Sequence, residues 1–150
     1  MKKLSQYITD QDFQCRCCGK TKPDWIDAVV PEYEDLRKLL WGVFDLLRKQ
    51  YPVVITSAYR CEVRNARVGG ATYSPHIFGI ALDIAVPLEK RQEIVEYLLM
   101  SPFLRVGHRK YANKQKHIHI DIAAKIADDL YRAGKIPLQV RNAYREVREW

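Results

Sequence analysis

The sequence contains no run of about 18 apolar residues, and this absence excludes a membrane-spanning helix. Its first seven residues include two lysines but no apolar stretch follows them, so we expect no secretory signal peptide. Internal repeats and low-complexity segments are also absent. Hydrophobic residues make up 47% of the chain and charged residues 29%, a composition that argues against disorder. With a length of 150 residues, we expect residues 1–150 to form one domain.

Cysteines are few and unevenly placed. Cys15, Cys17 and Cys18 crowd into four positions, while Cys61 stands alone far downstream. No Cys-x-x-Cys pair is followed by another at zinc-finger spacing. A structural zinc site and a long-range disulfide from Cys61 to one of the other three both remain possible. Because no export signal is found, reduced and partly buried thiols are the default expectation.

Acidic residues are fewer than basic ones, since 18 Asp and Glu face 25 Lys and Arg and leave a net charge of +7. This balance favours a polyanionic neighbour such as nucleic acid, a membrane surface or an anionic cell wall. The charges are spread along the chain, so simple solubility explains them equally well. A nucleic-acid-binding domain would interleave basic residues with exposed aromatics on one face, and this pattern is not found. We therefore expect no nucleic-acid partner.

The hydrophobic spacing predicts helices and strands in mixed order. Between them, a polar stretch after Arg60 with Asn65, Gly69 and Gly70 indicates a functional loop, and residues 105–116 indicate a basic loop. Too few strand–helix–strand units occur for a parallel doubly wound fold, so we predict the α+β class. The predicted helices span 32–50, 88–100, 124–134 and 138–148, and the predicted strands span 53–56 (buried), 80–86 and 117–122.

Two of the predicted strands carry residues suited to binding a metal. In the strand over 117–122, His117, His119 and Asp121 share one face, because side chains alternate along a strand. In the strand over 80–86, Asp83 projects from a face otherwise made of alanines, and His76 lies seven positions upstream. Two imidazoles and one carboxylate leave one position open on tetrahedral zinc, as in catalytic sites. The alternative for the two strand histidines is a hydrogen-bonded surface pair.

These residues form a recognisable pattern. The motif Ser74-x-His76-x-x-Gly79-x-Ala81-x-Asp83, followed by His117-x-His119, resembles the zinc D-Ala-D-Ala carboxypeptidase family. That family includes cell-wall carboxypeptidases, vancomycin-resistance dipeptidases and phage L-alanyl-D-glutamate endolysins. The resemblance covers roughly residues 5–122 and leaves 124–150 as a helical C-terminal extension. Further matching segments are Ile55–Cys61, Asn65, Val68–Gly70 and Phe13-x-Cys15-x-Cys17-Cys18-Gly19.

The resemblance implies a small α+β domain of the hedgehog/D-Ala-D-Ala peptidase type, whose antiparallel sheet carries the metal ligands and packs against helices. It implies one catalytic zinc ion held by His76, Asp83 and His119. Arg60 would bind the substrate carboxylate or polarise its carbonyl, since its fork of donors suits either task. Ser74 would hydrogen-bond the substrate or brace the ligand loop.

The chain departs from several relatives at one position. Those relatives place an acidic general base three residues before the second histidine ligand, where this sequence has Lys116. The base is then His117, as in branches with a His-x-His pair, or an acidic residue from elsewhere. We expect His108 to be a surface-loop histidine.

The sequence therefore predicts a monomeric zinc metallopeptidase that hydrolyses an amide bond in peptidoglycan stem peptides. Either D-Ala-D-Ala carboxypeptidase or L-Ala-D-Glu endopeptidase activity fits the same metal motif. Without an export peptide, we expect the protein to stay in the cytoplasm until release, as phage lytic enzymes do, and then to act on the cell wall. The alternatives are a catalytically impaired zinc-binding module, favoured by Lys116, and a basic nucleic-acid-binding domain.

Overall fold

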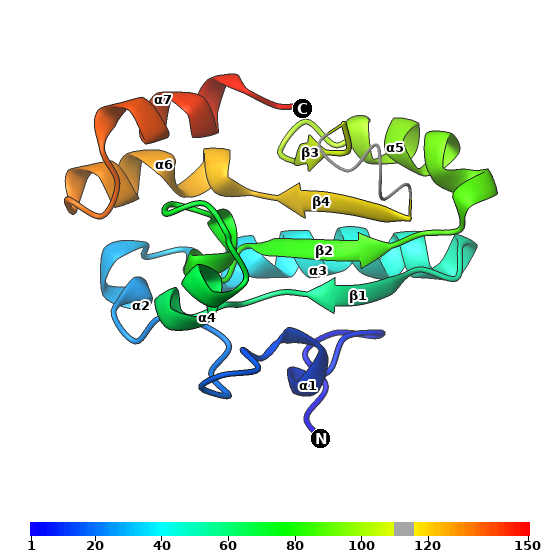
Figure 1. Cartoon of the computed structure of the whole chain (residues 1–150), viewed down its shortest axis with the longest axis horizontal. Helices are drawn as coiled ribbons and strands as arrows, with labels where there is room; N and C mark the ends of the chain where they lie inside the picture. The colour runs from blue at the N-terminus through cyan, green and yellow to red at the C-terminus, as the bar shows by residue number, and fades with distance from the viewer. Residues whose placement is uncertain (110–115) are drawn as a thin grey trace.

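A mixed arrangement of helices around one antiparallel sheet is seen in the computed structural model, which describes residues 1–109 and 116–150 (Figure 1). Within these residues the sheet has four strands in the order β1-β2-β4-β3. Every neighbouring pair of strands is antiparallel, so the predicted α+β class is confirmed. The strands are β1 (Val54–Ser57), β2 (Ala81–Ala85), β3 (Arg105–Gly107) and β4 (His117–Asp121).

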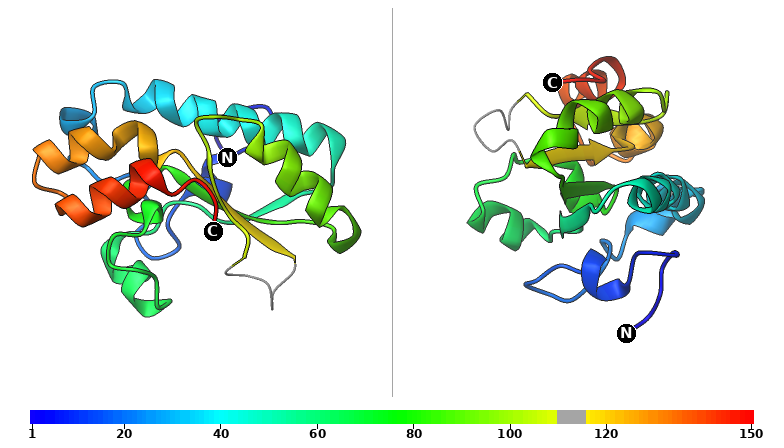
Figure 2. Two further views of the ribbon diagram at one scale, coloured as in Figure 1. Left: turned by 90° about the horizontal axis from the view of Figure 1, so that it is seen from above. Right: turned by 90° about the vertical axis from the view of Figure 1, so that its right-hand side faces the viewer.

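Helices lie on both faces of this sheet. The long helix α3 (Tyr33–Gln50) lies behind the sheet in Figure 1, while the short α4 (Glu62–Arg67) lies in front of it (Figures 1 and 2). Helices α6 (Ala123–Arg132) and α7 (Leu138–Glu146) pack against each other near the end of β4 (Figure 1). The remaining elements are α1 (Asp10–Phe13), α2 (Ile26–Val29), α5 (Arg91–Leu99) and the 3-10 turns η1 (Pro75–Phe78) and η2 (Leu88–Lys90).

The predicted alternation along the two central strands is confirmed. Ile80, Leu82 and Ile84 are fully buried, as are Ile118 and Ile120 of β4. These side chains join the apolar face of α3 in one hydrophobic core. Burial of several large aliphatic side chains, at about 1.5–3 kcal/mol each, fixes the register of the two strands. A slip by one residue would turn the opposite face, with its polar side chains, into the core.

The first strand differs from the prediction of a buried strand. The side chain of Val54 is 60% exposed, and only the preceding Val53 is fully enclosed. The reason is the strand order, because β1 forms one edge of the sheet and pairs only with β2. A short β-branched run cannot by itself distinguish an edge strand from a central one.

The prediction of two loops is also partly wrong, because each contains a short helix or strand. Residues 62–67 of the expected functional loop form α4, which Cys61 caps by accepting a hydrogen bond from the Arg64 amide through its Sγ. Arg105–Gly107, expected within a basic loop, form β3 and pair with the end of β4. The part of that loop over 110–115 lies outside the described residues.

The other predicted helices are found close to their expected bounds. The helix expected over 88–100 begins as η2 and continues as α5, and those expected over 124–134 and 138–148 are α6 and α7. Among the described residues, none of the helices combines the length and the apolar character needed to cross a bilayer.

Candidate metal centre

Three side chains from separate elements meet on the face of the sheet opposite the core. Asp83 lies in the middle of β2 and His119 in the middle of β4, and the two residues are direct cross-strand partners. His76 comes from η1, which precedes β2. The possible ligand atoms of these three residues lie within 4.8 Å of one another.

Local sequence explains how η1 presents His76. The side chain of Ser74 caps this turn by accepting a hydrogen bond from the His76 amide at 3.3 Å, and Pro75 follows at the first helical position. Gly79 ends the turn with a φ of +69°, a left-handed conformation that other residues adopt only with strain. The Ser-x-His-x-x-Gly spacing therefore encodes a short capped turn that carries a buried histidine into the sheet.

The hydrogen bonding of His76 leaves one nitrogen facing a carboxylate. Its Nδ1 lies 2.6 Å from the backbone oxygen of Ala58, which can only accept, so the proton is on Nδ1. The Nε2 atom then carries a lone pair, is buried, and has no hydrogen-bond partner among the described residues. It lies 3.0 Å from Oδ1 of Asp83. Two lone pairs held this close repel each other unless a proton or a metal cation lies between them.

In His119, too, one ring nitrogen contacts a hydrogen-bond acceptor and the other faces Asp83. Its Nε2 lies 2.7 Å from Oδ2 of Asp121, and its Nδ1 lies 3.0 Å from Oδ1 of Asp83. Asp121 is fully buried and also accepts a hydrogen bond from the Ala123 amide at 2.9 Å. A histidine that donates one nitrogen to a carboxylate and offers the other to a metal is the usual outer-shell arrangement of zinc sites. The donor set of two imidazoles and one carboxylate thus fits zinc.

The protein groups also bias the protonation of this cluster. Burial would lower the pKa of His119, but hydrogen bonds to Asp121 and Asp83 outweigh it and raise the pKa to about 9. Burial lowers the pKa of His76. Burial would raise the pKa of Asp83, yet the neighbouring imidazole of His76 and the hydrogen bond with His119 hold it well below its usual range. The carboxylate is therefore ionised at neutral pH and available as a ligand.

A cavity of about 520 Å³ opens onto these three side chains. Arg60 and Ser74 line it together, and a guanidinium nitrogen of Arg60 lies 3.4 Å from the hydroxyl oxygen of Ser74. This volume is in the range of small-molecule and peptide-side-chain sites. The cluster is thus open to a substrate on one side and closed by the sheet on the other.

Residues 6–121 match the model of the family described as Peptidase M15, and this range covers well over half of the chain. The chain belongs to the peptidase M15 family. The resemblance to zinc D-Ala-D-Ala carboxypeptidases predicted from the motifs is thereby confirmed, and the chain is a metallopeptidase by family. Comparisons with curated proteins and with solved structures gave no match.

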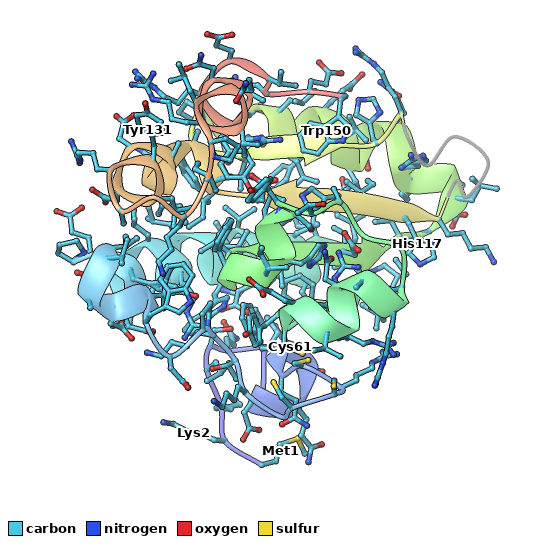
Figure 3. All side chains as sticks on the ribbon, turned by 60° about the vertical axis from the view of Figure 1, so that its left-hand side comes forward. Met1, Lys2, Cys61, His117, Tyr131 and Trp150 are labelled. Carbon is cyan, nitrogen blue, oxygen red and sulfur yellow. The ribbon has the colours of Figure 1, made fainter. Side chains whose placement is uncertain are left out.

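The structure brings together most, but not all, of the residues singled out in the sequence of this M15 peptidase. The three predicted ligands converge, and Arg60 and Ser74 line the same cavity. His117 begins β4 (Figure 3), is half-buried, and is not among the described residues that line the cavity. His108 is partly buried after β3, with its Nε2 2.8 Å from Glu149, and lies outside the cavity lining.

The burial of Arg105 beside the metal centre was not predicted from the sequence, which indicated a basic loop at this position. This side chain is buried, with its guanidinium carbon 5.1 Å from the ring centre of Tyr144 and 4.6 Å from that of Trp150. Its Nε lies 3.6 Å from Oδ1 of Asp121. The positive charge thus faces the carboxylate that orients His119. The cross-strand pairing of Arg105 with Asp121 could be known only once β3 was recognised.

The C-terminal residues complete the cavity, although they lie outside the range matched to the M15 family. Trp150 extends the sheet at β3, because its amide donates to the Val106 oxygen at 3.1 Å and its own oxygen accepts from the His108 amide at 2.7 Å. Its ring centre lies 5.4 Å from that of His119 (Figure 3 labels Trp150). Tyr144 of α7 hydrogen-bonds the backbone oxygen of Tyr73 across the cavity.

Substituting Gly107 by Ala is expected to disturb this wall of the cavity. A Cβ at position 107 would lie 2.8 Å from ring atoms of Trp150, so the indole must move. Overpacking of this kind costs about 1–3 kcal/mol. Gly42→Ala in α3 is the matched control, because nothing lies within 4 Å of the added methyl and Ala favours a helix by roughly 0.5–1 kcal/mol. Urea unfolding measures both, and a Gly107→Ala variant as stable as Gly42→Ala would contradict the packing described.

Proposed function

We propose that this chain is a zinc metallopeptidase that hydrolyses an amide bond in peptidoglycan stem peptides. The observation that carries the proposal is the pair of imidazole nitrogens, His76 Nε2 and His119 Nδ1, each 3.0 Å from Oδ1 of Asp83. Each imidazole has its other nitrogen committed to an acceptor. Membership in the peptidase M15 family supports the same reading.

His76, Asp83 and His119 would hold the zinc ion, and Asp121 would fix the orientation of His119. Zinc bound there would polarise the scissile carbonyl and make water a stronger nucleophile at neutral pH. Three protein ligands leave room for water or substrate, as catalytic rather than structural zinc sites require. The open side of the cluster faces the cavity, so the substrate reaches the metal centre from that side.

Arg60 is the side chain best placed to bind the substrate. It lines the cavity beside Ser74, and stem peptides carry free carboxylates that a guanidinium binds through paired hydrogen bonds. Arg105 lines the same cavity, but its guanidinium is buried between aromatic rings and faces Asp121. We therefore assign substrate binding to Arg60, with Ser74 orienting it, and a supporting role to Arg105.

We assign the general base to His117. Asp83 carries the only side-chain carboxylate among the described residues that line the cavity, and it would serve as a ligand. Lys116 occupies the position of the acidic base of several relatives and is exposed. The side chain of His117 shares its strand face with His119, two residues away. Its imidazole would take a proton from the attacking water and pass it to the leaving amine.

A catalytically impaired zinc-binding module is the second candidate function. Two observations favour it, namely the lysine at position 116 and the position of His117 outside the cavity lining. Both candidates keep the metal ligands, so only turnover separates them. Incubation of zinc-loaded protein with purified muropeptides, followed by mass spectrometry of the fragments, decides between them. Release of one alanine identifies the carboxypeptidase, separation of L-Ala from D-Glu identifies the endopeptidase, and intact muropeptides would contradict the proposed hydrolysis.

Zinc binding is expected to weaken as the pH falls. The pKa of His119, about 9, lies above neutral pH, so zinc must displace a proton from this imidazole. Below a pH of about 9, the apparent zinc affinity should therefore fall about tenfold per pH unit. Because burial lowers the pKa of His76, its protonation adds competition only at more acidic pH.

Competition of the metal-stripped protein with a chromophoric chelator, repeated across this pH range, measures the slope. Activity should decline in acid together with bound zinc. A zinc affinity that does not change with pH would contradict His119 as a ligand. If activity vanishes while zinc stays bound, the loss of activity at low pH is caused by protonation of the general base.

A further inference from the structure

A second cluster of metal-binding side chains lies away from the cavity. The Sγ atoms of Cys15, Cys18 and Cys61 lie within 4.8 Å of one another. Cys15 and Cys18 belong to the segment after α1, while Cys61 caps α4, which Figure 3 shows just above the N-terminal segment. All four cysteines of the chain, which include Cys17, are free thiols. The cluster therefore joins two segments that are distant in sequence.

Backbone amides point at these sulfur atoms. The amides of Cys17 and Cys61 both donate to Sγ of Cys15 at 3.4 Å. The amide of Arg64 donates to Sγ of Cys61 at 3.5 Å. Such donors stabilise the negative charge of a thiolate, and metal-bound thiolates commonly have them. The site thus supplies the outer-shell contacts of a metal centre as well as its ligands.

The turn that returns Cys18 toward Cys15 is built by the backbone. Gly19 adopts a φ of +72° and its amide donates to the Cys15 oxygen at 2.8 Å. The amide of Cys15 donates in turn to the Lys20 oxygen at 2.8 Å. A Cys-x-x-Cys-Gly sequence in this conformation places two sulfurs on the same side of a tight turn. The third sulfur, that of Cys61, approaches from the other segment.

We propose that Cys15, Cys18 and Cys61 bind a structural zinc ion through their thiolates, distinct from the ion at His76. Zinc–sulfur bonds of about 2.3 Å place tetrahedral ligand sulfurs about 3.8 Å apart, which the observed spacing accommodates. Three soft thiolates select zinc over magnesium or calcium. Since Cys18 is exposed, water can complete the fourth position.

A metal ion here would hold the wall of the cavity in place. Cys61 directly follows Arg60, whose amide donates to the His76 oxygen at 3.1 Å. On the other side, the Tyr59 amide donates to the Phe13 oxygen at 3.1 Å, close to Cys15 in sequence. The ion would thus tie the N-terminal segment to the segment after β1 that carries Arg60. This positioning role rests on the proposed function, whereas the metal site itself does not.

Metal content and cobalt spectroscopy test the site without using activity. Protein purified under reducing conditions should contain about two zinc ions per chain, and Cys15→Ser or Cys61→Ser should each remove about one of them. Asp83→Ala should remove the other. In cobalt-substituted Asp83→Ala, thiolate-to-cobalt charge-transfer absorption should persist, because the remaining ion has sulfur ligands. Cobalt-substituted Cys61→Ser should lose this absorption.

Cys17→Ser is the matched control, because Cys17 lies in the same segment but its Sγ is not among the three that group together. The Cys17 Sγ accepts from Arg67 at 3.9 Å and its side chain also contacts Cys61, so this variant tests directly whether a fourth thiolate is needed. This variant should keep both ions. Equal loss of zinc in Cys17→Ser would overturn the three-ligand assignment. An intact mass of the purified protein that is lower by two hydrogens would show that two of the cysteines form a disulfide and do not bind a metal. If the serine variants do not fold, the Asp83→Ala protein alone decides, since absence of charge-transfer absorption in its cobalt form overturns the proposal.

Discussion

Replacing Asp83 by Asn is expected to abolish both zinc binding at the catalytic centre and peptidase activity. The substitution keeps the size of the side chain but removes the charge that faces both His76 Nε2 and His119 Nδ1 at 3.0 Å. Loss of an outer-shell partner costs about 10–100-fold in metal affinity, so loss of a charged ligand should cost more than about 100-fold. The fold should persist, because β2 pairs with its neighbours through the backbone.

Asp121→Asn is a second variant, which we expect to have a smaller effect on zinc affinity than Asp83→Asn. Asp121 is not among the three clustered ligand residues but accepts from His119 and from the Ala123 amide. Its zinc affinity should fall by about 10–100-fold, between the wild type and Asp83→Asn. Zinc titration of the three metal-stripped proteins gives the order of affinities. Equal affinities for wild type and Asp83→Asn would show that Asp83 is not a ligand.

His117→Ala is expected to lower turnover by about 10²–10⁴-fold while zinc stays bound. The three ligands remain in this variant, and only the proposed proton acceptor is lost. Turnover on a muropeptide and zinc content are both measured, with His108→Ala as the matched control. His108 lies near Glu149 and outside the cavity lining, so its loss should leave turnover unchanged.

Other outcomes of the His117 experiment reassign the site. Near-normal turnover with zinc still bound would show that another group carries the proton. Loss of zinc from His117→Ala would make His117 a ligand and remove that role from His119. Because His119 already contacts Asp83 and Asp121, the structure predicts that zinc is retained.

The central strands and the metal ligands could be predicted from the sequence because their signals are local. Alternation over 80–86 and 117–122 follows from burial of one strand face, and the spacing from Ser74 to Asp83 encodes a capped turn and a strand. The edge position of β1 could not be predicted, because it depends on which strands lie beside it. The resemblance to the family supplied the expectation that Asp83 binds the same metal ion as His76 and His119.

The missed features depend on long-range pairing. Strand β3 has only three residues, Arg105–Gly107, and it exists because β4 and the Trp150 segment flank it. The side chain of Arg105 is a buried cation that contacts aromatic rings and faces Asp121. Arginine side chains are usually exposed, so its burial could not be expected from the residue type. The close approach of Cys61 to Cys15 and Cys18 likewise joins segments that only the fold brings together.

Anomalous scattering at the zinc absorption edge, from crystals of the reduced protein, tests the central claim most directly. The account predicts a peak bounded by His76 Nε2, Asp83 Oδ1 and His119 Nδ1, at about 2.0–2.2 Å from each atom. The same peak should be missing from crystals of Asp83→Asn. A zinc-loaded crystal with no peak between these three side chains, or with the ion held by His117 in place of His119, would contradict the account.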